Sequence, residues 1–270
     1  MLGKLFKHDF SSTAKPLLLF SVIVLAVSGA GTGLKYVLDL PVLNGDNLYS
    51  IRFVITMLII ACYFALFAYL ILMLILIVIR YYRNLFTEEG YLTFTLPTTT
   101  GKILLSKFLS AYLTMFIALI VAAGGLAILT FIFPSKLFGT TLTIRDLFDL
   151  IFRAFGENTL ASVEVCILIP LFIAEIILLL FFSVTLGSLL AKRLKLFASF
   201  GFFYGFMTIL NFIRTLFLSI YILNIANIFD TASTNQAVTI FLFAMLMLSL
   251  AVTVLSYLFS HLLLKKKLNI

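Results

Sequence analysis

Long stretches without a charged side chain dominate this sequence. Runs that lack Asp, Glu, Lys and Arg cover residues 17–34, 53–79, 108–135, 196–213 and 231–264, and the run 165–191 contains one charge, Glu175. A helix needs about 20 apolar residues to cross the hydrocarbon core of a bilayer, and each run is close to or beyond that length. The sequence therefore predicts an all-α, polytopic membrane protein with six transmembrane helices.

The composition excludes a soluble globular domain. Apolar residues make up 63% of the chain and charged residues 11%, with a mean hydropathy of +1.21. Soluble domains contain about 45–50% apolar and about 25% charged residues. Since no linker or low-complexity tract interrupts the chain, we treat residues 1–270 as a single transmembrane domain.

The distribution of Lys and Arg predicts the orientation in the membrane. With six spans both termini lie on one side, and that side holds thirteen Lys and Arg against five on the other. The positive-inside rule places the richer side in the cytoplasm, so both termini are expected to be cytoplasmic. The net charge of +8 belongs to this asymmetry and favours anionic lipid headgroups over nucleic acid as a partner.

Two amphipathic segments are expected outside the spans. Residues 2–12 separate Leu2, Leu5, Phe6 and Phe10 from Lys4, Lys7, His8 and Ser11, which predicts an N-terminal interface helix over 1–15 that ends as Pro16 turns the chain into the membrane. Residues 143–156, within an external segment over 134–162, place Ile144, Leu147, Phe148, Ile151, Phe152 and Phe155 opposite Arg145, Asp146, Asp149 and Arg153. This spacing predicts an external surface helix that covers the outer mouth or simply packs on the surface.

The cytoplasmic loop at 80–103, between the second and third spans, combines acidic and apolar side chains. Its residues Glu88, Glu89, Gly90, Leu92, Phe94, Leu96 and Pro97 place an acidic pair beside large apolar groups. Gly90 is suited to end the second helix, and Thr98, Thr99 or Thr100 to cap the third. A solvated loop does not need such apolar residues, so we expect a structured element that docks on a soluble partner.

This loop resembles the coupling loop of bacterial ATP-binding-cassette (ABC) exporter permeases of the type-two class. The similarity rests on Glu88, Glu89, Leu96, Pro97 and Lys107, and it extends to the amphipathic start, the six spans and the basic end. It implies a plasma-membrane permease that pairs with a second permease chain and couples to separate cytoplasmic ATPase subunits, which hold the ATP and Mg. The family usually carries re-entrant external helices between its fifth and sixth spans, an element that residues 211–229 could supply here.

No enzyme or metal site is expected in this chain itself. The glycines at 29, 31 and 33 lack the Gly-Lys-Ser/Thr ending of a phosphate-binding loop, and the spacings Gly29/Gly33 and Gly201/Gly205 favour close helix packing instead. His8 and His261 have no matching ligands nearby in sequence, and Cys62 and Cys166 lie in apolar stretches typical of buried thiols. We therefore expect no cofactor in this chain.

Two function classes remain open. One is the ABC permease, moving a hydrophobic peptide, a lipid or a drug-like molecule; the other is a self-sufficient secondary carrier or channel. The scarcity of polar residues within the spans favours an apolar or amphipathic cargo over an ion.

Two charges, Glu175 and Arg214, fall within predicted spans. At 1.5 Å per residue from the cytoplasmic ends of their helices, they lie about 24 Å and about 27 Å into the membrane. The matching depths predict a bidentate ion pair, within one chain or across a dimer interface, that could serve as an outer latch. The alternative is that Arg214 extends to the outer headgroups while Glu175 is protonated or bonded to a hydroxyl group.

Overall fold

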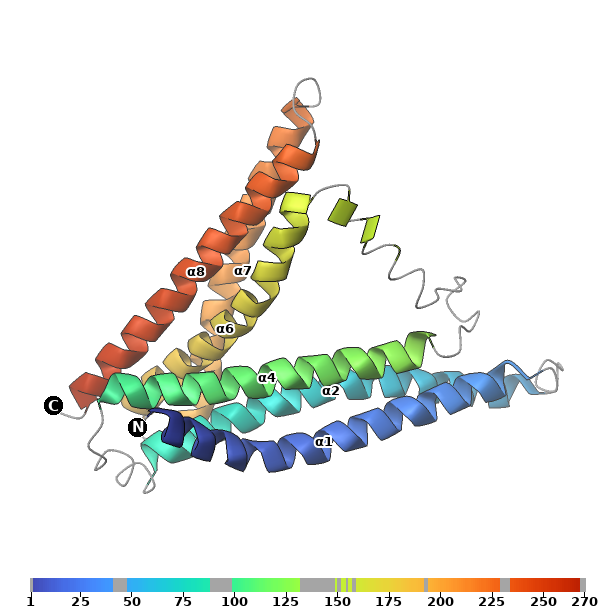
Figure 1. Cartoon of the computed structure of the whole chain (residues 1–270), viewed down its shortest axis with the longest axis horizontal. Helices are drawn as coiled ribbons and strands as arrows, with labels where there is room; N and C mark the ends of the chain where they lie inside the picture. The colour runs from blue at the N-terminus through green and yellow to red at the C-terminus, as the bar shows by residue number, and fades with distance from the viewer. Residues whose placement is uncertain are drawn as a thin grey trace. The chain divides into compact units, whose positions relative to one another are not determined.

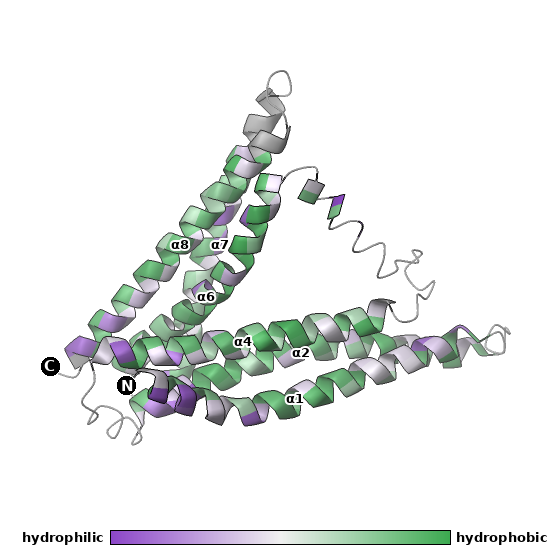
Figure 2. Ribbon diagram, in the orientation of Figure 1, coloured by the Kyte–Doolittle hydropathy of each residue, from purple (hydrophilic) through white to green (hydrophobic). Residues whose placement is uncertain are grey.

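The protein is an all-helical, multi-pass membrane protein. The computed structural model describes residues 2–40, 48–87, 99–131, 149, 152–153, 155–156, 159–191, 194–228 and 234–267, and no strand occurs within them. The helices are α1 (Leu2–Leu38), α2 (Tyr49–Phe86), α4 (Thr100–Phe131), α6 (Thr159–Leu190), α7 (Lys195–Ile228) and α8 (Thr234–Lys267) (Figure 1). Each is long and apolar enough to cross a membrane, which confirms the predicted fold class. Apolar residues cover most of each helix (Figure 2).

The first helix differs from its prediction. A break was expected at Pro16, but α1 continues through this residue from Leu2 to Leu38. Proline removes the amide that would bond the carbonyl of Ser12, which costs one helical hydrogen bond without ending the helix. The predicted amphipathic pattern is visible before Pro16, where Lys4 and Lys7 are exposed while Leu5 and Phe6 are half-buried. The interface segment is thus the first part of a longer helix.

The fifth span is also one continuous helix. α7 extends from Lys195 to Ile228, so residues 211–228 continue the helix and do not form a re-entrant hairpin. The external segment 134–162 lies largely outside the described residues. Within the expected helix 143–156, Asp149, Phe152, Arg153, Phe155 and Gly156 are described, and all five are helical.

The chain divides into two compact units. One unit contains residues 1–9, 77–112 and 154–270; the other contains residues 10–76 and 113–153. Helices α1, α2 and α4 each contribute to both, whereas α6, α7 and α8 belong to the first alone. We call these the α6–α8 unit and the α1–α2–α4 unit.

Polar and small side chains pack the α1–α2–α4 unit together. Ser21 Oγ and Tyr69 OH lie 2.9 Å apart between α1 and α2. A Cβ atom on Gly31 would lie 3.2 Å from the Cys62 side chain, so the missing side chain lets α1 and α2 approach closely. Leu38, Ile55 and Ile59 form an apolar cluster between the same helices.

Helix α6 is central to its unit because it packs against both α7 and α8. From Ile173 to Ser188 most of its residues are buried, including Phe181, Ser183 and Thr185. At its end, a Cβ atom on Gly187 would lie 2.7 Å from the backbone nitrogen of Ser199 and 2.8 Å from its Cα atom. The backbones of α6 and α7 therefore touch at Gly187.

The glycines that permit close packing are not those that their spacing suggests. Added Cβ atoms at Gly29, Gly33, Gly201 and Gly205 would have no neighbour within 4 Å. The expectation of close helix packing at these four positions is therefore wrong within the described chain. Close approach occurs at Gly31, Gly125 and Gly187, none of which belongs to a Gly-x-x-x-Gly pair.

Candidate functional site

The predicted coupling residues Glu88, Glu89, Gly90, Leu92, Phe94, Leu96 and Pro97 lie outside the described residues. The two flanks of this α2–α4 connection are described. α2 ends at Phe86 and α4 begins at Thr100, where the carbonyl of Thr99 accepts hydrogen bonds from the amides of Lys102 and Ile103 at 3.0 and 3.2 Å. Thr99 therefore occupies the N-cap position of α4, one of the three positions expected.

The α2 flank is fixed to α6. The Tyr81 and Thr185 hydroxyl oxygens lie 3.0 Å apart, and the Tyr81 ring stacks on Phe181 with ring centroids 3.9 Å apart. Tyr81 is buried despite its polar group. Its hydroxyl thus has a partner in an apolar region, where an unpaired hydroxyl would be costly.

The α4 flank is fixed to α8. Thr100 Oγ1 lies 3.3 Å from His261 Nε2, and the Tyr257 hydroxyl donates to the Gly101 carbonyl at 3.4 Å. A Cβ atom at Gly101 would lie 3.3 Å from the His261 ring. The first turn of α4 therefore lies directly against the last turns of α8.

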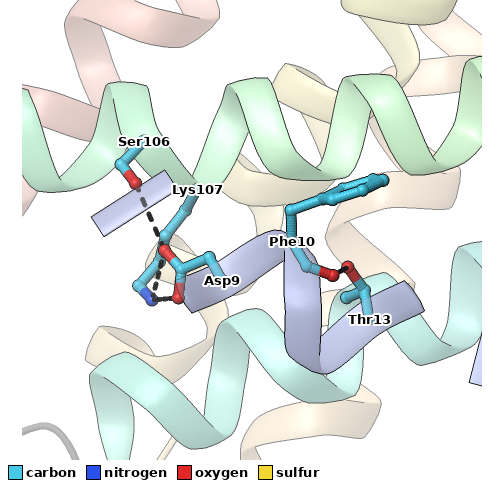
Figure 3. Close-up of polar contacts among 5 residues, drawn as sticks. All are labelled: Asp9, Phe10, Thr13, Ser106 and Lys107. Carbon is cyan, nitrogen blue, oxygen red and sulfur yellow. Dashed lines mark hydrogen bonds and ion pairs between the residues drawn. The ribbon is translucent and has the colours of Figure 1, made fainter. Parts of the chain in front are cut away.

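A buried ion pair joins the start of α1 to α4. Lys107 Nζ donates to both carboxylate oxygens of Asp9, at 3.2 and 3.4 Å, and the Ser106 hydroxyl donates to Asp9 at 3.3 Å (Figure 3). Both charged residues are less than a tenth exposed. In the sequence, Lys107 was notable only for the resemblance to the permease family, and Asp9 had no expected role. The missed signal is the position of Asp9, seven residues after Leu2 on the apolar face of the N-terminal segment.

Glu175 and Arg214 are in direct contact within one chain. Arg214 Nη2 lies 2.5 Å from Glu175 Oε1, and the guanidinium carbon lies 5.1 Å from the centroid of the Phe172 ring. The side chain of Glu175 is 2% exposed and that of Arg214 16%. A bidentate pair was predicted, but only one oxygen of Glu175 contacts Arg214. The other oxygen, Oε2, is buried without a hydrogen-bond partner. The stacking of Arg214 on Phe172 gives this cation a second support.

Another buried charge, Lys35, lies in the α1–α2–α4 unit. Its ammonium group donates to the Tyr63 hydroxyl at 3.1 Å and to the carbonyl of Leu129. That carbonyl is among the last four of α4, which have no partner within the helix. Lys35 also lies in the last turn of its own helix, so its charge faces the negative ends of two helix dipoles. These contacts give Lys35 a structural role without a carboxylate.

The described residues contain no group of three or more His, Cys, Asp and Glu side chains that could hold a metal ion.

Cys62 and Cys166 are free thiols, and Cys166 is exposed on the surface of the chain. Phe152, from the expected external helix, is 70% exposed.

Comparison with known proteins gives no relative: no family model, no curated protein and no solved structure matches this chain.

Proposed function

We propose that this chain is the membrane-spanning permease subunit of a bacterial ATP-driven exporter, paired with a second permease chain in the plasma membrane. ATP is hydrolysed by separate cytoplasmic ABC ATPase subunits. The residues of the α2–α4 connection dock on such a subunit and receive its motion. The cargo is an apolar or amphipathic molecule.

The attachment of both flanks of the α2–α4 connection is the observation that supports this proposal most. Tyr81 ties the incoming helix to α6, and Thr100 with Gly101 ties the outgoing helix to α8. A few residues further along α4, Lys107 ties it to the start of α1. A force on a short connection anchored in this way reaches three other helices, because packed helices move as rigid elements.

The described spans are predominantly apolar, which suits an apolar or amphipathic cargo. In this proposal a partner hydrolyses the ATP, and the acidic and apolar residues of the connection offer a docking surface of the helix-in-groove kind. A secondary carrier or channel would instead need a partner-independent route for its substrate.

The connection is tested by replacing Phe94 and Leu96 together with Asp. Both residues lie outside the spans that the sequence predicts, so the variant should insert and fold. Loss of the apolar contact should reduce the amount of ATPase subunit that co-purifies in mild detergent by about tenfold or more, because burying two such side chains contributes about 3 kcal/mol or more.

A matched control introduces two Asp residues at the α1–α2 connection instead of the α2–α4 connection. Leu40 and Tyr49 are exposed apolar residues at the end of α1 and the start of α2. The variant with both changed to Asp should retain the ATPase subunit. Undiminished co-purification with Phe94 and Leu96 replaced would refute the docking role, and transport by the purified chain alone would favour the secondary carrier.

A further inference from the structure

Two carboxylate oxygens on α6 are buried and have no hydrogen-bond partner. They are Oε2 of Glu175 and Oε2 of Glu164, and they are the only such side-chain atoms in the described part of the chain. An unpaired buried acceptor is unfavourable, and more so when it carries charge, so such groups are rare in folded proteins. A buried acceptor that the fold leaves unpaired is a candidate for a contact with a bound molecule.

The two carboxylates lie on the same face of α6. Residues eleven positions apart in an α-helix differ by about 20° around the axis and by about 16 Å along it. Pro170 lies between them and cannot donate to the carbonyl of Cys166, which weakens the helix there. Glu164 and Glu175 therefore form two successive positions along one side of a helix that can bend between them.

Burial along α6 changes between these two positions. The segment from Ile173 to Ser188 is largely buried by the rest of its unit, whereas Ile167 and Ile169 are half exposed and Phe172 is 36% exposed. Glu175 thus lies at the edge of the packed part of the helix. Arg214 is held by Glu175 Oε1 and by the Phe172 ring, which leaves Oε2 as the free acceptor of the pair.

The charges in this region favour a cation. Apart from Lys195 at the start of α7 and the lysines at the end of α8, the described charged groups of α6, α7 and α8 are Glu164, Glu175 and Arg214, with a formal sum of −1. Two unpaired acceptors and a net negative charge among these described groups match an ammonium or guanidinium group, which has only donors. Ile167 and Phe172, exposed apolar residues on the stretch of α6 between the two positions, match an apolar tail.

We propose that Glu164 and Glu175 form a two-position binding site for the cationic headgroup of an amphipathic molecule. This inference rests on the proposed function, because it names the chemical class of the cargo. In the proposed orientation the site occupies the outer half of the membrane, with Glu175 as the inner position and Glu164 as the outer one.

The test measures binding of tryptophan octyl ester, a cationic amphiphile, to the chain in nanodiscs of zwitterionic lipid without any ATPase or ATP. The chain has no Trp, so the indole fluorescence comes from the probe, and empty nanodiscs give the background of membrane partitioning. The uncharged comparison is N-acetyl-tryptophan octyl ester. We expect the native chain to bind the cationic ester about tenfold or more tightly than the uncharged ester, since charge-assisted hydrogen bonds are the strong ones.

Glu164→Gln should abolish this preference, and it breaks no hydrogen bond of the described structure. Glu175→Gln leaves Arg214 without its carboxylate partner, so the double variant Glu175→Gln with Arg214→Gln is measured as well. Both the single and the double variant should lose the preference for the cationic ester. Asp39→Asn removes an exposed negative charge elsewhere and should keep it. Equal affinity of the native chain for both esters, or an unchanged preference in either Glu164→Gln or the double variant, would overturn the proposal. A failure of ATPase association would not affect these results, so the two proposals fail separately.

Discussion

Charged residues within the apolar spans are few, and each one restricts how the helices can pack. Depth counting was enough to pair Glu175 with Arg214, because a charge within a span needs a partner at the same level. It could not predict that the contact is single or that Arg214 stacks on Phe172, because counting residues gives only the depth of each side chain. Glu164 was missed because it lies between the external segment over 134–162 and the run that begins at residue 165, and neither includes it.

The Asp9–Lys107 pair should be more sensitive to single than to double replacement. Asp9→Asn or Lys107→Met alone leaves a buried charge without its partner, and each should lower the free energy of unfolding by about 3 kcal/mol. The double variant should lose less than the sum of the two. Unfolding in detergent measures this, with Lys15→Met as the control because Lys15 is exposed on the same helix as Asp9. Strictly additive losses would show that the two groups do not interact.

The Glu175–Arg214 pair gives a second test by charge reversal. Glu175→Gln and Arg214→Gln should each lower the melting temperature, because each leaves a charge in an apolar region. Exchanging the two residues, Glu175→Arg with Arg214→Glu, should recover part of the loss, although the stacking of Arg214 on Phe172 is removed. A swapped variant less stable than both single variants would argue against a direct pair.

At the level of elements, hydropathy located each of the six long helices of the described chain, but glycine spacing did not locate the helix contacts. Gly29, Gly33, Gly201 and Gly205 have the favoured spacing yet face open space, while Gly187 contacts the next helix. The reason is that a close approach needs one small residue at the point where two axes cross, and the sequence does not show where they cross. Pro16 was misjudged for a related reason, since a proline can remain within a helix that its neighbours support.

Gly187→Ala should separate α6 from α7. The added methyl group would lie 2.7 Å from a backbone atom of α7, which cannot move aside as a side chain could. The expected cost is about 1–3 kcal/mol, typical of an overpacked contact. Gly201→Ala is the matched control, because its methyl group meets nothing within 4 Å and alanine favours the helix. Melting temperatures in detergent compare the two, and an equally stable Gly187→Ala would contradict the backbone contact.

For the whole molecule, the charge-free runs were sufficient to predict six helices because the bilayer fixes the length of each span. The division into an α6–α8 unit and an α1–α2–α4 unit was not predictable, since it depends on long-range contacts such as those of Tyr81, Thr100 and Lys107. No feature of the hydropathy pattern marks the positions near residues 9, 76 and 112 where single helices pass from one unit to the other.

The orientation of the whole chain follows from the positive-inside rule and is open to a direct test. Lys4, Asp39 and Lys266 are exposed on the described chain, so a cysteine at each reports the side of the membrane and not burial. In a background with Cys62 and Cys166 changed to Ala, a membrane-impermeant maleimide applied to intact cells should label Asp39→Cys at once. Lys4→Cys and Lys266→Cys should react only after permeabilisation, because the positive-inside rule predicts that the side with thirteen of the nineteen Lys and Arg residues is cytoplasmic. Labelling of Lys4→Cys or Lys266→Cys in intact cells would show that the orientation is opposite to the predicted one. It would also contradict the expectation that the α2–α4 connection meets a cytoplasmic ATPase.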